Sequence, residues 1–140
     1  MSVSIALTFA WLELVVGLSF LEAPLKFRAP GITRELGLGI GRLVFRALNG
    51  MELVLAVLIA VFLVADDGSS ELLWPYWLLV ALLDAQTMML HGFMDKRAAR
   101  IVAGETLSAS NQHYVYIGLE VAKIALLVVL GSMLLGEIAG

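Results

Sequence analysis

Four long apolar stretches dominate the chain, and the short segments between them hold most of its charged residues. A helix needs about 20 mostly apolar residues to cross a hydrocarbon core of roughly 30 Å, and each stretch reaches that length. Runs this long and continuous exclude the strands of a membrane β-barrel. The pattern therefore predicts an all-α fold, a single-domain integral membrane four-helix bundle. Its spans are expected at about residues 4–23, 38–65, 72–93 and 112–135.

Helix-breaking residues set the predicted boundaries. The first span is expected to end at Pro24, because proline has no N–H with which to continue the helix. The segment at residues 23–30 is too rich in proline for a helix and is expected to lie along the membrane interface. Gly37 and Gly41 stand four residues apart, which favours a small-residue face for close helix packing. A nucleotide-binding loop is the less favoured interpretation of these glycines, since no βαβ unit surrounds them.

The basic residues fall almost entirely on one side of the predicted bundle. Eight of the nine lysines and arginines lie after span one, at the start of span two, or after span three. The exception is Lys123, which lies inside the fourth span. Because lysine and arginine accumulate in cytoplasmic loops, we expect both termini outside (N-out/C-out) and the basic loops in the cytoplasm. This topology predicts a protein of the bacterial inner (plasma) membrane, surrounded by membrane lipids.

Composition narrows the classes of protein further. Hydrophobic residues make up 61% of the chain and charged residues 15%. Soluble domains average about 45–50% hydrophobic residues and about a quarter charged residues. These values exclude a disordered chain, a nucleic-acid-binding protein and an ordinary cytosolic enzyme. The absence of cysteine excludes disulfides, thiolate catalysis and cysteine-ligated metal sites. No Gly-x-Ser-x-Gly or His-Glu-x-x-His motif occurs, so an enzyme is the less favoured class.

Polar and ionisable residues at membrane depth are the candidates for function. An unpaired charge in hydrocarbon is costly, so such residues usually face the bundle interior and mark a pathway or a site. Spacings of three and four residues place the polar positions of spans two to four on one face of each helix. We expect these faces to converge, with Asp84 level with Glu120 and His91 level with His113. The candidate polar-core residues are Glu13, Glu22, Arg46, Asn49, Glu52, Asp84, His91, His113, Glu120 and Lys123.

Three interpretations of this polar core are open. In the first, it is an ion or proton relay or a ligand pathway, and the protein is transporter-like. In the second, His91 and His113 bind a metal ion or haem in a redox or enzyme subunit, the one interpretation that requires a cofactor. In the third, buried charge pairs only fix how the helices pack. The expected pairs are Lys123 with Glu120 or Asp84, and Arg46 with Glu22 or Glu52. A bundle this small has little room for its own pathway, so a homo-oligomer or larger assembly is expected.

Short motifs around the first two spans resemble a known family. Residues 17–30 (GLSFLEAPLKFRAP), 35–37 (ELG) and 41–45 (GRLVF) contain a glycine, an Ala-Pro-Leu-x-Phe element and a later phenylalanine. Residues 94–97 (MDKR) and His113 are similar to an Asp-x-x-Arg element and a histidine of that family. The chain thus resembles the bacterial relatives of transmembrane protein 205, a four-span family of unknown function. The resemblance implies a four-span topology and no particular reaction.

Overall fold

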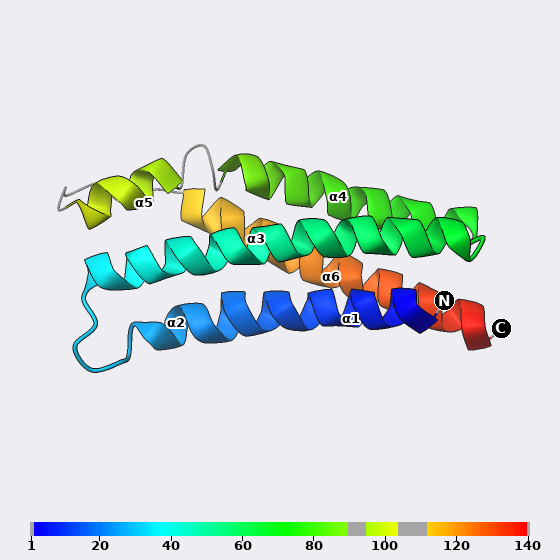
Figure 1. Ribbon diagram of the computed structural model, residues 1–140, viewed down its shortest axis with the longest axis horizontal. Coiled ribbons are helices and arrows are strands. Elements are labelled where there is room, and N and C mark those ends of the chain that lie inside the picture. Colours follow the sequence, from blue (N-terminus) through cyan, green and yellow to red (C-terminus); the bar gives the residue numbers. More distant parts are fainter. Residues whose placement is uncertain (1, 90–94, 104–111, 140) are drawn as a thin grey trace.

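The computed structural model describes residues 2–89, 95–103 and 112–139 (Figure 1). Within these residues the chain forms helices and short turns, and no strand occurs. The prediction of an all-α fold is therefore confirmed for this part of the chain. The elements are α1 (Ser2–Val15), the π-helix η1 (Val16–Glu22), α2 (Ala23–Lys26), α3 (Arg34–Ala65), the 3-10 helix η2 (Ser70–Leu72), α4 (Leu73–Met88), α5 (Asp95–Val102) and α6 (Gln112–Ala139).

Three helices are long and apolar enough to cross a membrane. They are Ser2–Lys26 with a hydropathy of 1.9, Arg34–Ala65 with 2.4, and Val115–Ala139 with 2.1. By length and composition, these three helices are suited to a multi-pass membrane protein. α4 is 16 residues long, or about 24 Å, which is shorter than the roughly 30 Å of a hydrocarbon core. The predicted third span runs beyond α4 into residues outside the described part, so a fourth crossing stays a prediction.

The longer helices pack side by side around a shared core. α1 packs against α3 and α6, and α4 packs against the same two helices, so α1 and α4 occupy opposite corners (Figure 1). Leucines recur on the buried face of α6 with the three- and four-residue spacing of one helix side. Together with α1, α3 and α4 they form an apolar core that includes Trp11, Val15, Leu55, Ile59, Leu79, Leu83, Leu127, Leu130 and Leu134.

The first helix does not end at Pro24, which corrects the prediction. It continues from α1 through η1 and α2 to Lys26, so the first half of the proline-rich segment is helical. In η1 the N–H of Ala23 donates to the carbonyl of Leu18, five residues earlier. Pro24 cannot donate to an earlier carbonyl, and a local π adjustment re-satisfies backbone groups that a proline frees in a membrane helix. The proline therefore widens this helix instead of stopping it.

α3 begins earlier than predicted and packs its glycines differently. The helix starts at Arg34 because the hydroxyl of Thr33 accepts a hydrogen bond from the N–H of Leu36, at 3.1 Å. A Cβ at Gly37 would collide with the ring of Phe27, and a Cβ at Gly41 would lie 2.6 Å from Nζ of Lys26. The predicted small-residue face therefore exists, but it receives side chains from the preceding segment instead of the backbone of a second helix.

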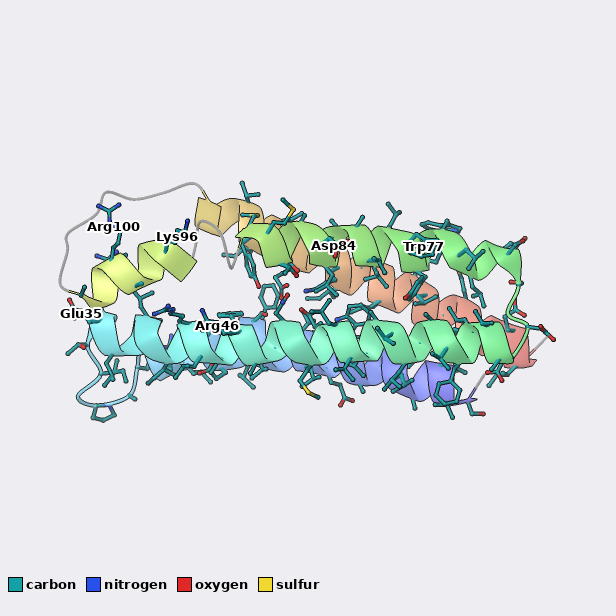
Figure 2. The ribbon with its side chains drawn as sticks, turned by 45° about the horizontal axis from the view of Figure 1, so that its top comes forward. Glu35, Arg46, Trp77, Asp84, Lys96 and Arg100 are labelled. Atoms are coloured by element: carbon teal, nitrogen blue, oxygen red, sulfur yellow. The ribbon has the colours of Figure 1, made fainter. Side chains whose placement is uncertain are left out.

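Charge is segregated between the two ends of the molecule. We call one end the acidic end: both chain termini and the α3–α4 turn lie there (Figure 1), with Asp66, Asp67, Glu71 and Glu137. The described part of the chain has no lysine or arginine at that end. We call the other the basic end, where α5 packs against α3 and carries Lys96 and Arg100 (Figure 2). This segregation agrees with the loop charges from which the topology was predicted.

Candidate functional site

One group of buried polar side chains joins α1, α3, α4 and α6. Every helix of the core contributes to it, and five of its six members are at most 2% exposed. The sixth is a half-buried serine on η1. We call this group the buried polar cluster; its members are Trp11, Ser19, Glu52, Gln86, Glu120 and Lys123.

Lys123 lies at the centre of the cluster and is fully buried. Its Nζ lies 2.5 Å from Oε1 of Glu52 and 2.7 Å from Oε1 of Glu120. The same Nζ donates to Oε1 of Gln86 at 2.6 Å. An ammonium group has three N–H donors, so each donor of Lys123 has an acceptor. The lysine therefore ties α3, α4 and α6 together.

Neutral donors hold both carboxylates in place. Oε1 of Glu52 accepts a hydrogen bond from the indole Nε1 of Trp11 at 2.8 Å. Oε1 of Glu120 accepts one from Nε2 of Gln86 at 2.6 Å, and Oε2 of Glu120 accepts one from the hydroxyl of Ser19 at 2.6 Å. Bonds to a charged acceptor are stronger than neutral ones, and these three bonds fix the carboxylates toward the ammonium.

Helical spacing brings the cluster onto the buried helix faces. Glu120 and Lys123 are three residues apart on α6, and positions three apart share one side of a helix. On α3, Asn49 and Glu52 have the same spacing and both are buried. Asn49 makes a separate contact toward the basic end, where its Oδ1 accepts from the hydroxyl of Thr87 on α4 at 2.9 Å.

Glu13 and Asp84 do not join the cluster, contrary to our expectation that the polar positions converge. Both are exposed, Glu13 on α1 and Asp84 on α4, and Figure 2 shows Asp84 on α4. Each stands two positions from a cluster residue, Trp11 and Gln86 respectively. Two positions turn an α-helix by about 200°. Glu13 and Asp84 therefore lie on helix sides facing away from the cluster, and Lys123 pairs with Glu120 and not with Asp84.

Two more candidates lie toward the basic end. Glu22 is half-buried, and its Oε2 is 3.9 Å from Nζ of Lys26. Arg46 is exposed on α3 (Figure 2). The Glu52 carboxylate, which was one expected partner of Arg46, is instead paired with Lys123.

The histidine interpretation stays a prediction. His91 lies outside the described residues, and so does the side chain of His113, whose backbone belongs to α6. Among the side chains that the structure describes, no group of three histidine, aspartate or glutamate residues is placed to hold a metal ion. The predicted metal or haem site at His91 and His113 is therefore neither supported nor opposed.

Sequence reasoning missed three members of the cluster, Trp11, Ser19 and Gln86. The predicted candidates on the first and third spans are ionisable residues, with Asp84 and His91 on the third span, so these three neutral residues were left out. Gln86 belongs to the side of α4 that faces α6. A buried tryptophan N–H or glutamine amide needs a hydrogen-bond partner. Counting all side-chain donors along each span, and not charges alone, would have placed these residues among the candidates.

The charges of the cluster do not balance. It contains two carboxyl groups and one ammonium group, so with all three ionised its net charge is −1. Chemically, such a group of side chains can bind one proton or another small monovalent cation.

Comparisons with protein-family models, curated proteins and solved structures find no match to this chain.

Proposed function

We propose that this protein is a multi-pass inner-membrane protein that binds a proton at the buried polar cluster and passes it across the membrane. In this proposal the chain has four spans, both termini outside and the basic end in the cytoplasm, and it works as a homo-oligomer or within a larger assembly. The observation that carries the proposal is the unbalanced charge of the cluster, in which two carboxyl groups share one lysine.

The charge imbalance matters because of where the cluster lies. Glu52 is separated from Ala65, the last residue of α3, by about 20 Å of helix. If that end of α3 meets the membrane surface, the cluster lies within the roughly 30 Å hydrocarbon core. A net charge is costly there, and removing one partner of a buried ion pair is strongly destabilising. One bound proton makes the cluster neutral, so gaining and losing that proton switches the cluster between two electrostatic states.

Infrared spectroscopy tests whether the cluster holds a proton. A protonated carboxylic acid has a C=O stretching band that a carboxylate lacks. The parent for this test is Glu13→Gln/Asp84→Asn, which removes the two exposed carboxyl groups nearest the cluster in sequence. We expect the band in the reconstituted parent at neutral pH. We expect its loss on adding either Glu52→Gln or Glu120→Gln, because each leaves one carboxylate for one ammonium. The proposal is contradicted if the parent lacks the band. It is also contradicted if the band remains both in the parent with Glu52→Gln and in the parent with Glu120→Gln.

A purely structural role is the second candidate, and one observation favours it. All three donors of Lys123 have acceptors within the protein. The lysine therefore also links α3, α4 and α6 through hydrogen bonds that leave none of its donors free. This candidate predicts that the cluster stabilises the fold and that the protein carries no proton flux. The flux measurement at the end of the Discussion separates the two candidates.

A further inference from the structure

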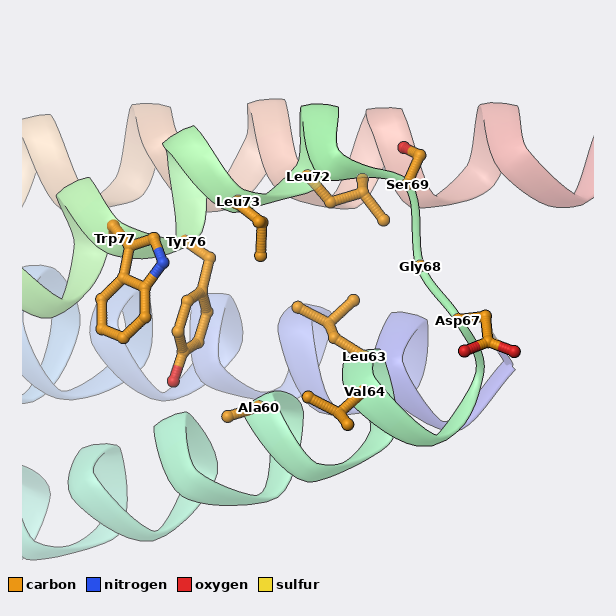
Figure 3. Close-up of a pocket in the computed structure, with 10 residues that line it drawn as sticks. All are labelled: Ala60, Leu63, Val64, Asp67, Gly68, Ser69, Leu72, Leu73, Tyr76 and Trp77. Atoms are coloured by element: carbon orange, nitrogen blue, oxygen red, sulfur yellow. The ribbon is translucent and has the colours of Figure 1, made fainter.

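A pocket of about 340 Å³ opens at the acidic end, away from the buried polar cluster (Figure 3). It lies between the last turns of α3, the α3–α4 turn and the first turns of α4. Its walls are mostly aliphatic, with Leu63 and Val64 from α3 and Leu72 and Leu73 from the chain after the turn. Its volume is within the about 300–1,000 Å³ typical of small-molecule sites.

Two aromatic rings form one side of the pocket. The hydroxyl of Tyr76 donates to the carbonyl of Ala56 at 2.8 Å, which fixes the ring and satisfies its polar atom inside the protein. The ring of Trp77 packs edge-on against it, with centroids 5.3 Å apart and an interplanar angle of 71°. Trp77 is 60% exposed, so much of its surface is free to contact a ligand.

A carboxylate lines the other side of the pocket. Asp67 contributes to the lining, and Figure 3 shows it on the turn, across the aliphatic wall from Trp77. Its backbone has a φ of 50°, in the left-handed region, which aspartate and asparagine tolerate better than most residues. The other charged side chains described at this end, Asp66, Glu71 and Glu137, are also acidic, and among the described residues no lysine or arginine lies there. The electrostatic field at the pocket therefore attracts cations and repels anions.

We propose that this pocket binds a small organic ammonium ion with an apolar body. Asp67 supplies the opposite charge for the ammonium group at one side of the pocket, and the aliphatic wall with the rings of Trp77 and Tyr76 receives the apolar body. The occupant is a free small molecule and not the headgroup of a membrane lipid. This site is independent of the proton proposal, because about 17 Å of α3 separates Glu52 from Leu63.

Ligand-observed NMR on the full chain in dodecyl maltoside tests the proposal, since this detergent carries no ammonium group. The probe is phenyltrimethylammonium, with tert-butylbenzene as its neutral isostere and benzenesulfonate as an anion of similar size. We expect saturable binding of phenyltrimethylammonium, weaker binding of tert-butylbenzene and none of benzenesulfonate. Asp67→Asn keeps the shape of the turn and is expected to weaken cation binding at least about threefold. The matched control is Glu71→Gln, which removes a charge from the same end but outside the pocket lining.

Three outcomes would overturn the proposal. Equal binding of the cation and its neutral isostere would make the pocket merely apolar. Unchanged affinity in Asp67→Asn, or an equal loss in Glu71→Gln, would remove Asp67 as the recognition group. Complete displacement of the probe by phosphatidylethanolamine, at ratios found in a membrane, would assign the pocket to a lipid headgroup. The same titration on Glu120→Gln is expected to give the affinity of the unsubstituted chain, so a failure here leaves the proton proposal untouched.

Discussion

Lys123 binds acceptors on three helices, Glu52 on α3, Gln86 on α4 and Glu120 on its own helix α6. A lysine near a helix end can reach water by extending its side chain along the helix, but this ammonium is fully buried. Its neighbours must therefore replace water entirely. The lysine and its two carboxylates therefore stabilise the protein only when all three are present.

Substitution of Lys123 alone, and together with Glu52 and Glu120, tests whether the three residues stabilise the protein only together. Lys123→Met leaves two carboxyl groups without their cation, and loss of one partner from a buried ion pair costs about 3–5 kcal/mol. We expect a decrease of that size in the free energy of unfolding, measured by circular dichroism during titration of mixed micelles with sodium dodecyl sulfate. The triple substitution Lys123→Met/Glu52→Gln/Glu120→Gln is expected to recover most of the loss. A triple variant no more stable than Lys123→Met would contradict the coupling.

The charged members of the cluster could be predicted, and the neutral ones could not be found by the same reasoning. Glu52, Glu120 and Lys123 stand out because a charge at membrane depth needs a partner. Gln86 and Trp11 carry no charge, and nothing in their spacing distinguishes them from residues that face lipid. The prediction for Asp84 was wrong for the opposite reason, because this residue is charged but lies on the exposed side of α4. Which of two neighbouring polar residues faces inward depends on packing between helices, which a single sequence does not specify.

The π-helix η1 lies between Pro24 and the residue that α1 contributes to the buried polar cluster. η1 spans Val16–Glu22 and carries Ser19, the donor to Glu120. Its hydrogen bonds span five residues instead of four, so each of its turns holds more residues than an α-turn. Residues in η1 are therefore rotated relative to an unbroken α-helix. We expect this rotation to be what directs Ser19 toward α6. The sequence predicted a break at Pro24 but not this alternative, because a packed helix can absorb a proline that would end an isolated one.

A double-mutant cycle tests whether η1 positions Ser19. Pro24→Ala allows the segment to return to an α-helix, and Ser19→Ala removes the hydroxyl that binds Glu120. If the π-helix is what directs Ser19, the proline matters to that bond only while the hydroxyl is present. We therefore expect the two substitutions to be non-additive, with a coupling of at least about 0.5 kcal/mol in the free energy of unfolding. Additive effects within error would show that Ser19 reaches Glu120 without help from η1.

The segregation of charge between the two ends of the molecule suits a protein that spans a membrane in one orientation. The acidic end carries the chain termini and the α3–α4 turn, and the basic end carries α5 and the start of α3. Hydrophobic patterning alone predicted the helical fold and located three of the long apolar helices. It placed helix ends less well, at Pro24 and Arg34, because local capping and packing decide them. In the proposed orientation, the cluster lies between two aqueous surfaces of opposite charge.

Proton flux through reconstituted protein tests the central claim most directly. The measurement uses proteoliposomes that enclose a pH-sensitive dye, with a potassium gradient and valinomycin to impose a membrane potential. We predict acidification of the lumen faster than in protein-free vesicles, and its reduction to the protein-free rate in Glu120→Gln and Glu52→Gln. Asp84→Asn is the matched control, because it removes a carboxyl group from the same part of α4 as Gln86 but outside the cluster, and it is expected to retain flux. Flux equal to that of protein-free vesicles in the unsubstituted protein, or flux that persists in Glu120→Gln and Glu52→Gln, would contradict the account.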